Sequence, residues 1–232
     1  MPTAKSPMAL TAELVARIER LEPDPGPRPG AIHLTEADYE AVVAELLAKH
    51  TPDVLWVFAY GSLIWKPEFT AVEHRRATAR GWHRSFCMTL TRWRGTPEQP
   101  GLMMNLDRGG CCQGVAYRLP DEDHAGQIGR LVRREMSVKQ GTNVPRWITV
   151  ETDAGKLRAF AITASPKGIS YAGKLPLEEV ARTLARAAGH WGSGADYLFQ
   201  TVTKLEEFGI RDSNLWRLQQ LVADEILEMT RL

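Results

Sequence analysis

Apolar positions along the chain fall into two periodicities, which mark strand-like and helix-like segments. The longest uninterrupted apolar run ends at Tyr60-Gly61-Ser62 and predicts a strand over residues 54–60 that is buried on both faces. Further short, strand-like segments are separated by Gly- and Pro-containing turns, and the last two form a predicted hairpin around Asp153-Ala154-Gly155. These segments are residues 82–91, 101–107, 112–119, 146–152 and 156–164.

Elsewhere, apolar residues recur every three or four positions, as on one face of a helix. The segment at 36–49 has the clearest start, because Thr35 and Asp38 have the spacing of a capping box. Gly189 and Gly209 stand where two of the later helices should stop. The predicted helices cover residues 8–21, 36–49, 123–136, 176–188, 195–208 and 213–229.

Strands joined by short turns, one central helix and a helical C-terminal third do not alternate as βαβ units would. We therefore predict an α+β fold: a small mixed or antiparallel β-barrel with flanking helices. The Pro/Gly-rich segment 22–30 interrupts the N-terminal helices and is typical of a linker. We expect residues 1–50 to form an N-terminal helical extension and residues 51–232 to form the main domain.

Composition narrows the range of functions. A formal charge of +1 gives no overall attraction to nucleic acid, and no apolar stretch reaches membrane-spanning length. The three cysteines, Cys87, Cys111 and Cys112, lack the spacing of a disulfide framework or a zinc site. We expect Cys111 and Cys112 to be buried and to pack as small apolar residues. With no signal-peptide core at the N-terminus, we expect a cytoplasmic protein without membrane or nucleic-acid partners.

A carboxylate lies on the apolar face of the predicted central helix. Ile128, Leu131 and Val132 define that face, and its continuation reaches Glu135. A buried carboxylate needs a polar partner or acquires a raised pKa, which suits proton transfer near neutral pH. The alternative is that Glu135, in the last turn, already faces solvent or pairs with an arginine.

The turn after the buried strand and a basic stretch nearby are further candidates for chemistry. Backbone N–H groups around Gly61 could hold a carbonyl oxygen or a carboxylate. Ser62 is not expected to be a nucleophile, because the G-x-S-x-G pattern is absent. The arginines between residues 73 and 94 either cover apolar strand surface, grip an anionic small substrate or, least in keeping with the net charge, bind nucleic acid. They are Arg75, Arg76, Arg80, Arg84, Arg92 and Arg94.

An ordered set of motifs resembles the ChaC family of glutathione-specific γ-glutamylcyclotransferases from about residue 54 onward. The set begins with Tyr60-Gly61-Ser62-Leu63-Ile64-Trp65-Lys66-Pro67 and ends with Gly209-Ile210-Arg211-Asp212. Between them lie Arg94-Gly95-Thr96, Pro100-Gly101, Gly114-Val115-Ala116-Tyr117, Arg134-Glu135 and Tyr197-Leu198. One departure is that many members carry a Gly-Tyr pair a few residues after the glutamate, whereas this chain has Gly141-Thr142-Asn143.

The resemblance implies a γ-glutamylcyclotransferase barrel over residues 51–232 and a lyase reaction that needs no cofactor and no metal. In that reaction the substrate's α-amine attacks its own γ-carbonyl, and glutathione yields 5-oxoproline and Cys-Gly. Glu135 is then the expected catalytic residue, and the residues expected in substrate binding are Tyr60, Gly61, Ser62, Leu63, Ile64, Trp65, Tyr197 and Arg94. Arg80 and Arg84 are alternatives to Arg94 for balancing the carboxylates of the peptide. The alternatives are other γ-glutamyl amino acids or amines as substrates, or a non-catalytic binding or regulatory protein on the same fold.

Overall fold

In the computed structural model, which describes residues 7–231, the chain forms two compact units. The barrel unit contains residues 28–88 and 104–174, and the helical unit contains residues 89–103 together with the described residues before 28 and after 174. Residues 1–6 of the expected extension and residue 232 of the expected main domain lie outside the described residues. Residues 28–50 group with the barrel, and the residues before them group with the helical unit. The domain boundary expected at residue 50 stays a prediction.

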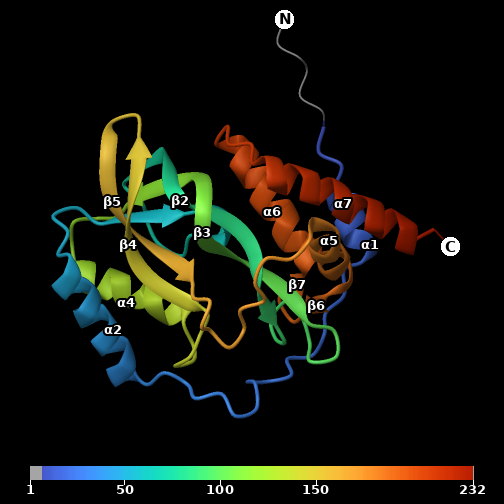
Figure 1. The fold of residues 1–232 in the computed structure, drawn as a ribbon, viewed down its shortest axis with the longest axis horizontal. Helices are drawn as coiled ribbons and strands as arrows, with labels where there is room; N and C mark the ends of the chain where they lie inside the picture. Colours follow the sequence, from blue (N-terminus) through green and yellow to red (C-terminus); the bar gives the residue numbers. More distant parts are fainter. Residues whose placement is uncertain (1–6, 232) are drawn as a thin grey trace, which may run out of the picture. The chain divides into compact units, whose positions relative to one another are not determined.

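Five strands close into a barrel in the order β1-β3-β2-β4-β5 (Figure 1). Strand β1 pairs antiparallel with β3 and parallel with β5, so the predicted mixed barrel of an α+β protein is confirmed. Every residue of β1 is buried, as the continuous apolar run predicts. The strands are β1 (Trp56–Ala59), β2 (Glu73–Leu90), β3 (Gly101–Arg118), β4 (Asn143–Thr152) and β5 (Gly155–Ala164).

Two strands are longer than the sequence pattern suggests. The segments predicted at 101–107 and 112–119 form the single strand β3, because Gly109 and Gly110 adopt positive φ angles of 100° and 70° without leaving the strand. Strand β2 begins at Glu73 rather than residue 82. The first half of this strand is rich in charged residues and therefore lacks the apolar pattern by which strands are predicted.

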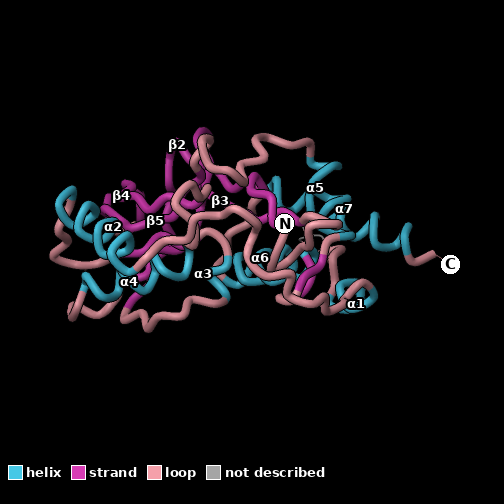
Figure 2. The backbone as a smooth tube through the Cα atoms, turned by 90° about the horizontal axis from the view of Figure 1, so that it is seen from below, coloured by secondary structure: helices cyan, strands magenta, loops and turns pink. Residues whose placement is uncertain are grey.

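Three helices belong to the barrel unit. Helix α2 (Glu36–Lys49) and helix α4 (His124–Glu135) pack against each other and lie side by side in both views (Figures 1 and 2). The predicted capping box is present: Thr35 accepts from the Asp38 backbone N–H, and the Asp38 carboxylate accepts from the Thr35 N–H. Between β1 and β2, helix α3 (Ser62–Trp65) is a single turn.

The helical unit consists of α1 (Ala12–Arg17), α5 (Leu177–Arg186), α6 (Gly194–Glu207) and α7 (Ser213–Met229), with the two-stranded pair β6 (Ala188–Gly189) and β7 (Gly192–Ser193). Gly209, with φ of 67°, follows the end of α6 as predicted. The prediction for Gly189 was wrong: this residue lies in β6, where an added Cβ would collide with the Trp93 carbonyl. Helix α1 is shorter than the predicted helix at 8–21.

A substitution at Gly114 tests how tightly β1 and β3 pack. A Cβ at this position would lie 2.5 Å from the Ala59 carbonyl oxygen and 2.7 Å from the Phe58 ring, both on β1. We expect Gly114→Ala to lower the free energy of unfolding by about 1–3 kcal/mol, because neither the backbone nor the buried ring can move aside cheaply. Chemical denaturation measures this change.

The matched control is Gln113→Ala, which alters an exposed side chain on the same strand. This control should stay within about 0.5 kcal/mol of the wild type. Equal stability of the two variants would contradict the tight packing of β1 on β3.

Candidate active site

The turn that follows β1 is held from inside the barrel by a buried arginine. Arg84, on β2, is 6% exposed and donates from Nε to the Tyr60 carbonyl oxygen over 2.6 Å. It also donates to the Gln113 carbonyl oxygen on β3. Arg84 therefore has a role outside those considered for the basic stretch: it fixes the backbone where the Tyr60-Gly61-Ser62 turn begins.

The turn itself is compact. The Ile64 N–H donates to the Gly61 carbonyl over 2.9 Å, and the Lys66 N–H donates to the Ser62 carbonyl over 2.7 Å. Gly61 has a φ of −135°, so a left-handed backbone is not what requires glycine there. Leu63 and Ile64 are buried and anchor α3, whereas Ser62 and Trp65 are partly exposed. Direct contact of these residues with a substrate stays a prediction.

The Tyr60 hydroxyl contacts both β3 and β5. The oxygen lies 2.9 Å from the Ile162 carbonyl and 3.0 Å from Asn105 Oδ1, and both neighbours can accept its proton. The residue is 8% exposed. Its observed hydrogen bonds therefore tie the end of β1 to β3 and β5.

Glu135 is the last residue of α4, and its side chain is 19% exposed. The side chain is partly buried, and it pairs with an arginine, which is one of the alternatives that the sequence left open. Its carboxylate lies 3.1 Å from Nε of Arg134, and Nη2 of the same arginine lies 3.5 Å from the Ser62 hydroxyl. Arg134 also donates from Nη1 to the Lys66 carbonyl over 2.7 Å. One guanidinium thus links the carboxylate at the end of α4 to the turn after β1.

Opposing electrostatic effects act on this carboxylate. Burial raises the pKa of Glu135 above its usual value of 4.5, the Arg134 charge partly lowers it, and Glu68 raises it further. Burial is the largest effect because desolvation penalises the charged form. The arrangement yields a carboxylate that takes up a proton more readily than an exposed glutamate does.

The N-terminal lead-in holds the segment that follows Glu135. The Tyr39 hydroxyl donates to the Met136 carbonyl over 2.9 Å, and Lys139 Nζ pairs with Asp38 over 2.9 Å. Residue His33 forms an antiparallel bridge with Val138. Residues 32–39 therefore fix the chain directly after α4, which gives this part of the lead-in a role in positioning the site.

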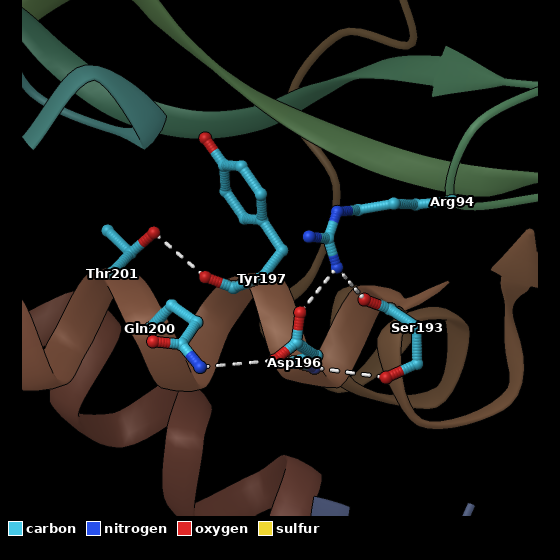
Figure 3. Close-up of polar contacts among 6 residues, drawn as sticks. All are labelled: Arg94, Ser193, Asp196, Tyr197, Gln200 and Thr201. Atoms are coloured by element: carbon cyan, nitrogen blue, oxygen red, sulfur yellow. Dashed lines mark hydrogen bonds and ion pairs between the residues drawn. The ribbon is translucent and has the colours of Figure 1, made fainter. Parts of the chain in front are cut away.

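Arg94 and Tyr197 lie together in the helical unit (Figure 3). Arg94 Nη1 donates to the Ser193 carbonyl over 2.6 Å and to the Asp196 carboxylate over 2.8 Å, and its guanidinium stacks 5.5 Å from the Tyr197 ring centre. Both Arg94 and Tyr197 are buried. The ion pair with Asp196 offsets the charge of Arg94, so contact between this arginine and a substrate stays a prediction.

The other arginines of the basic stretch mostly pair with acidic side chains. Arg80 bonds to Glu151 over 2.7 Å, and Arg92 bonds to Asp24 of the Pro/Gly-rich segment over 2.6 Å. These ion pairs match the interpretation of a solvated strand face better than that of an anion site. Contrary to the default expectation, Cys111 is exposed, whereas Cys112 is buried.

An open groove of about 780 Å³ adjoins Arg134 on the barrel unit. Its lining includes Arg134 but not Glu135. The groove is lined by Glu68, Phe69, Thr70, Leu119, Pro120, Glu122, Asp123, Gln127, Arg130, Leu131, Arg133 and Arg134.

Two further observations concern the described residues alone. No group of three or more His, Cys, Asp or Glu side chains among residues 7–231 is arranged to hold a metal ion. Within the same range, the structure contains no helix with the length and apolar character needed to cross a bilayer.

Reasoning from sequence missed the residues that support the candidate site. Arg134 stands beside Glu135, but the helical wheel places it on another face and gives no sign of its contact with Ser62. Asn105 offers a weak signal, as a polar residue in a strand that is otherwise largely apolar. Asn143 offers none, because neither its bond to the Glu135 carbonyl nor its bond to the distant Asn105 follows a local periodicity.

The sequence and the structure both match known proteins. The pattern of the ChaC-like protein family matches residues 55–225. An Escherichia coli protein named glutathione-specific γ-glutamylcyclotransferase is 36% identical over 176 residues, covering 75% of each chain. A mouse protein named glutathione-specific γ-glutamylcyclotransferase 1 is 34% identical over 156 residues, covering 64% of this chain and 68% of its own length.

Among solved structures, a selenomethionine-labelled yeast γ-glutamyl cyclotransferase described as specific to glutathione superposes with a TM-score of 0.66. The two share 21% identity, and the match covers 75% of this chain and 97% of the yeast chain. That likeness concerns the fold. The family match over residues 55–225, supported by relatives above 30% identity, shows that the chain belongs to the ChaC-like protein family.

Proposed function

We propose that the protein is a γ-glutamylcyclotransferase that cleaves glutathione to 5-oxoproline and Cys-Gly, with Glu135 as the group that moves the proton. Membership of the ChaC-like family and relatives named for this activity support the reaction. The observation that supports the role of Glu135 is its largely buried carboxylate, linked through Arg134 to the Tyr60-Gly61-Ser62 turn.

The reaction is intramolecular. The α-amine of the γ-glutamyl residue attacks its own γ-carbonyl carbon, a five-membered ring closes, and the amide nitrogen of Cys-Gly leaves. Holding nucleophile and electrophile in one bent conformer can correspond to an effective molarity on the order of 10⁵ M. Binding the bent substrate is therefore a large part of catalysis, and no cofactor is required for the chemistry.

The proton balance requires one group that first accepts and then donates. The α-amine is mostly protonated near neutral pH and has no lone pair in that form, so it first loses one proton to solvent. Ionised Glu135 then removes a second proton from the attacking nitrogen as the C–N bond forms. The same carboxyl then protonates the departing amide nitrogen, which restores the carboxylate. A raised pKa of Glu135 lies closer to neutral pH than the usual value of 4.5 does, which makes both proton transfers easier.

The turn after β1 supplies the second element of the proposal. In this proposal the N–H groups of residues 61–63 stabilise the tetrahedral oxygen, because the first amides of a helical turn have no partner within that turn. The loss of one such donor typically costs about 2.7–4 kcal/mol of transition-state stabilisation. Arg134 neutralises part of the charge of Glu135 in the resting state and keeps the carboxylate close to this turn.

Replacing the carboxyl by an amide tests the catalytic assignment. We expect Glu135→Gln to reduce release of 5-oxoproline from glutathione by about 10²–10⁴-fold, because an amide cannot accept the α-amine proton. The assay incubates purified protein with reduced glutathione, and in parallel with γ-Glu-Ala, and measures 5-oxoproline.

The matched control is Glu122→Gln, which neutralises an exposed carboxylate near the start of α4. This control should turn over at the wild-type rate. Undiminished turnover by a folded Glu135→Gln variant would show that Glu135 does not transfer the proton. Turnover of γ-Glu-Ala in preference to glutathione would assign the broader substrate class instead.

The same substitution has a defined effect on stability. Between the usual pKa of 4.5 and the raised value in the fold, native wild-type protein retains a proton that the unfolded chain has lost. Wild-type stability should therefore fall as pH rises through this interval. The amide introduced by Glu135→Gln cannot titrate, so the free energy of unfolding of this variant minus that of the wild type should increase between about pH 4 and pH 8. Urea denaturation across this range measures it, and a decreasing difference would show that the ion pair outweighs burial.

A further inference from the structure

A series of side-chain hydrogen bonds crosses the barrel unit and ends at Glu135. Asn105, on β3, is 1% exposed and donates from Nδ2 to Asn143 Oδ1 over 2.7 Å. Asn143, the first residue of β4, donates from its own Nδ2 to the backbone carbonyl of Glu135 over 2.6 Å. Two amide side chains thus connect a central strand to the end of α4; we call them the amide pair.

Backbone groups at both ends fix the orientation of the amide pair. The Leu106 N–H donates to Asn105 Oδ1 over 2.8 Å, and a backbone N–H can only donate. The Glu135 carbonyl can only accept. A single assignment of oxygen and nitrogen in both amides therefore satisfies the bonds from the Leu106 N–H and to the Glu135 carbonyl. The Tyr60 hydroxyl can donate its one proton either to Asn105 Oδ1, 3.0 Å away, or to the Ile162 carbonyl, 2.9 Å away. The amide pair has one stable arrangement.

The bond from Asn143 acts on a backbone group that the helix itself leaves without a partner. The last four carbonyls of an α-helix have no intrahelical donor, and Glu135 is the final residue of α4. Asn143 supplies that donor from β4, and the Tyr39 hydroxyl does the same for the next carbonyl, Met136, from α2. The peptide groups that follow Glu135 are thereby held from two sides, which fixes the direction in which its side chain leaves the helix.

We infer, on the basis of the proposed role of Glu135, that Asn143 and Asn105 are positioning residues for the cyclisation. Neither residue bonds to the Glu135 carboxylate, and only Asn105 reaches the segment expected to hold the substrate, through the Tyr60 hydroxyl. Instead, they lock the backbone of Glu135 to β3 and, through Asn105, to the hydroxyl of Tyr60 at the end of β1. The carboxylate and the turn after β1 are then held in one geometry.

The test replaces each amide by alanine in the full chain. A displacement of about 1 Å at a reacting group can cost on the order of 10²-fold, so we expect kcat with glutathione to fall roughly 10- to 100-fold in Asn143→Ala. KM should change by less than about threefold, because the substrate-binding groups remain. Asn105→Ala should show the same pattern, and the double variant should be no worse than about the poorer single variant, since both residues act in one series.

A pH profile separates positioning from simple destabilisation. The acid limb of kcat/KM should move to lower pH in Asn143→Ala, because a Glu135 side chain released from its fixed position gains contact with water. Asn143→Ser keeps a hydroxyl donor on a shorter side chain and should recover part of kcat. It also serves as the test protein if the alanine variant does not fold.

The structural control is Thr163→Val, on β5 opposite the start of β4. Its hydroxyl donates to the Val144 carbonyl over 3.1 Å and accepts from Arg146, so the variant loses buried hydrogen bonds that do not reach Glu135. This control should lose stability but keep kcat and the pH profile.

An unchanged kcat and acid limb in folded Asn143→Ala or Asn143→Ser would overturn the inference, even if Glu135→Gln is inactive. Turnover retained in Glu135→Gln would instead overturn the proposed function itself. The two failures are therefore distinguishable.

Discussion

The balance between burial and ion pairing at Glu135 determines what this structure can do. A carboxylate paired with arginine in water would have a lowered pKa and would be a poor proton acceptor near neutrality. A carboxylate buried without any partner would stay protonated. Here the side chain is 19% exposed, Arg134 lies 3.1 Å away, and burial remains the larger effect on its pKa. The proposed catalysis requires this intermediate state.

The barrel unit maintains that balance by bringing together chain segments that are remote in sequence. Strand β1 delivers the Tyr60-Gly61-Ser62 turn, whose backbone Arg84 holds from β2. Helix α4 delivers Glu135 at its C-terminal end, where Asn143 and Tyr39 supply donors to two successive carbonyls. Arg134 joins the two parts through Ser62 and Lys66. Most of these contacts end on backbone carbonyls and hold the chain in place, as a preorganised site requires.

The sequence predicted the features that depend on local pattern. The apolar run before Tyr60 gave a buried strand, and the stripe through Ile128, Leu131 and Val132 indicated Glu135, whose side chain is partly buried. Local pattern failed where side-chain direction or distant partners decide the outcome. Arg80 and Arg84 lie four residues apart on one strand, yet Arg80 has a 71% exposed side chain and Arg84 is buried beneath the turn. Asn105 and Asn143 meet across 38 positions, so no periodicity could reveal them.

Direct titration of the Glu135 carboxyl tests the account most sharply. In protein labelled with ¹³C at the glutamate carboxyl groups, the resonance absent from Glu135→Gln identifies this residue, and its chemical shift can be followed with pH. Because burial outweighs the charge of Arg134, we expect a midpoint above 4.5 that coincides with the acid limb of kcat/KM. A midpoint at or below 4.5 would contradict it, because Arg134 would then hold the carboxylate ionised and the proposed proton transfer would lose its physical basis.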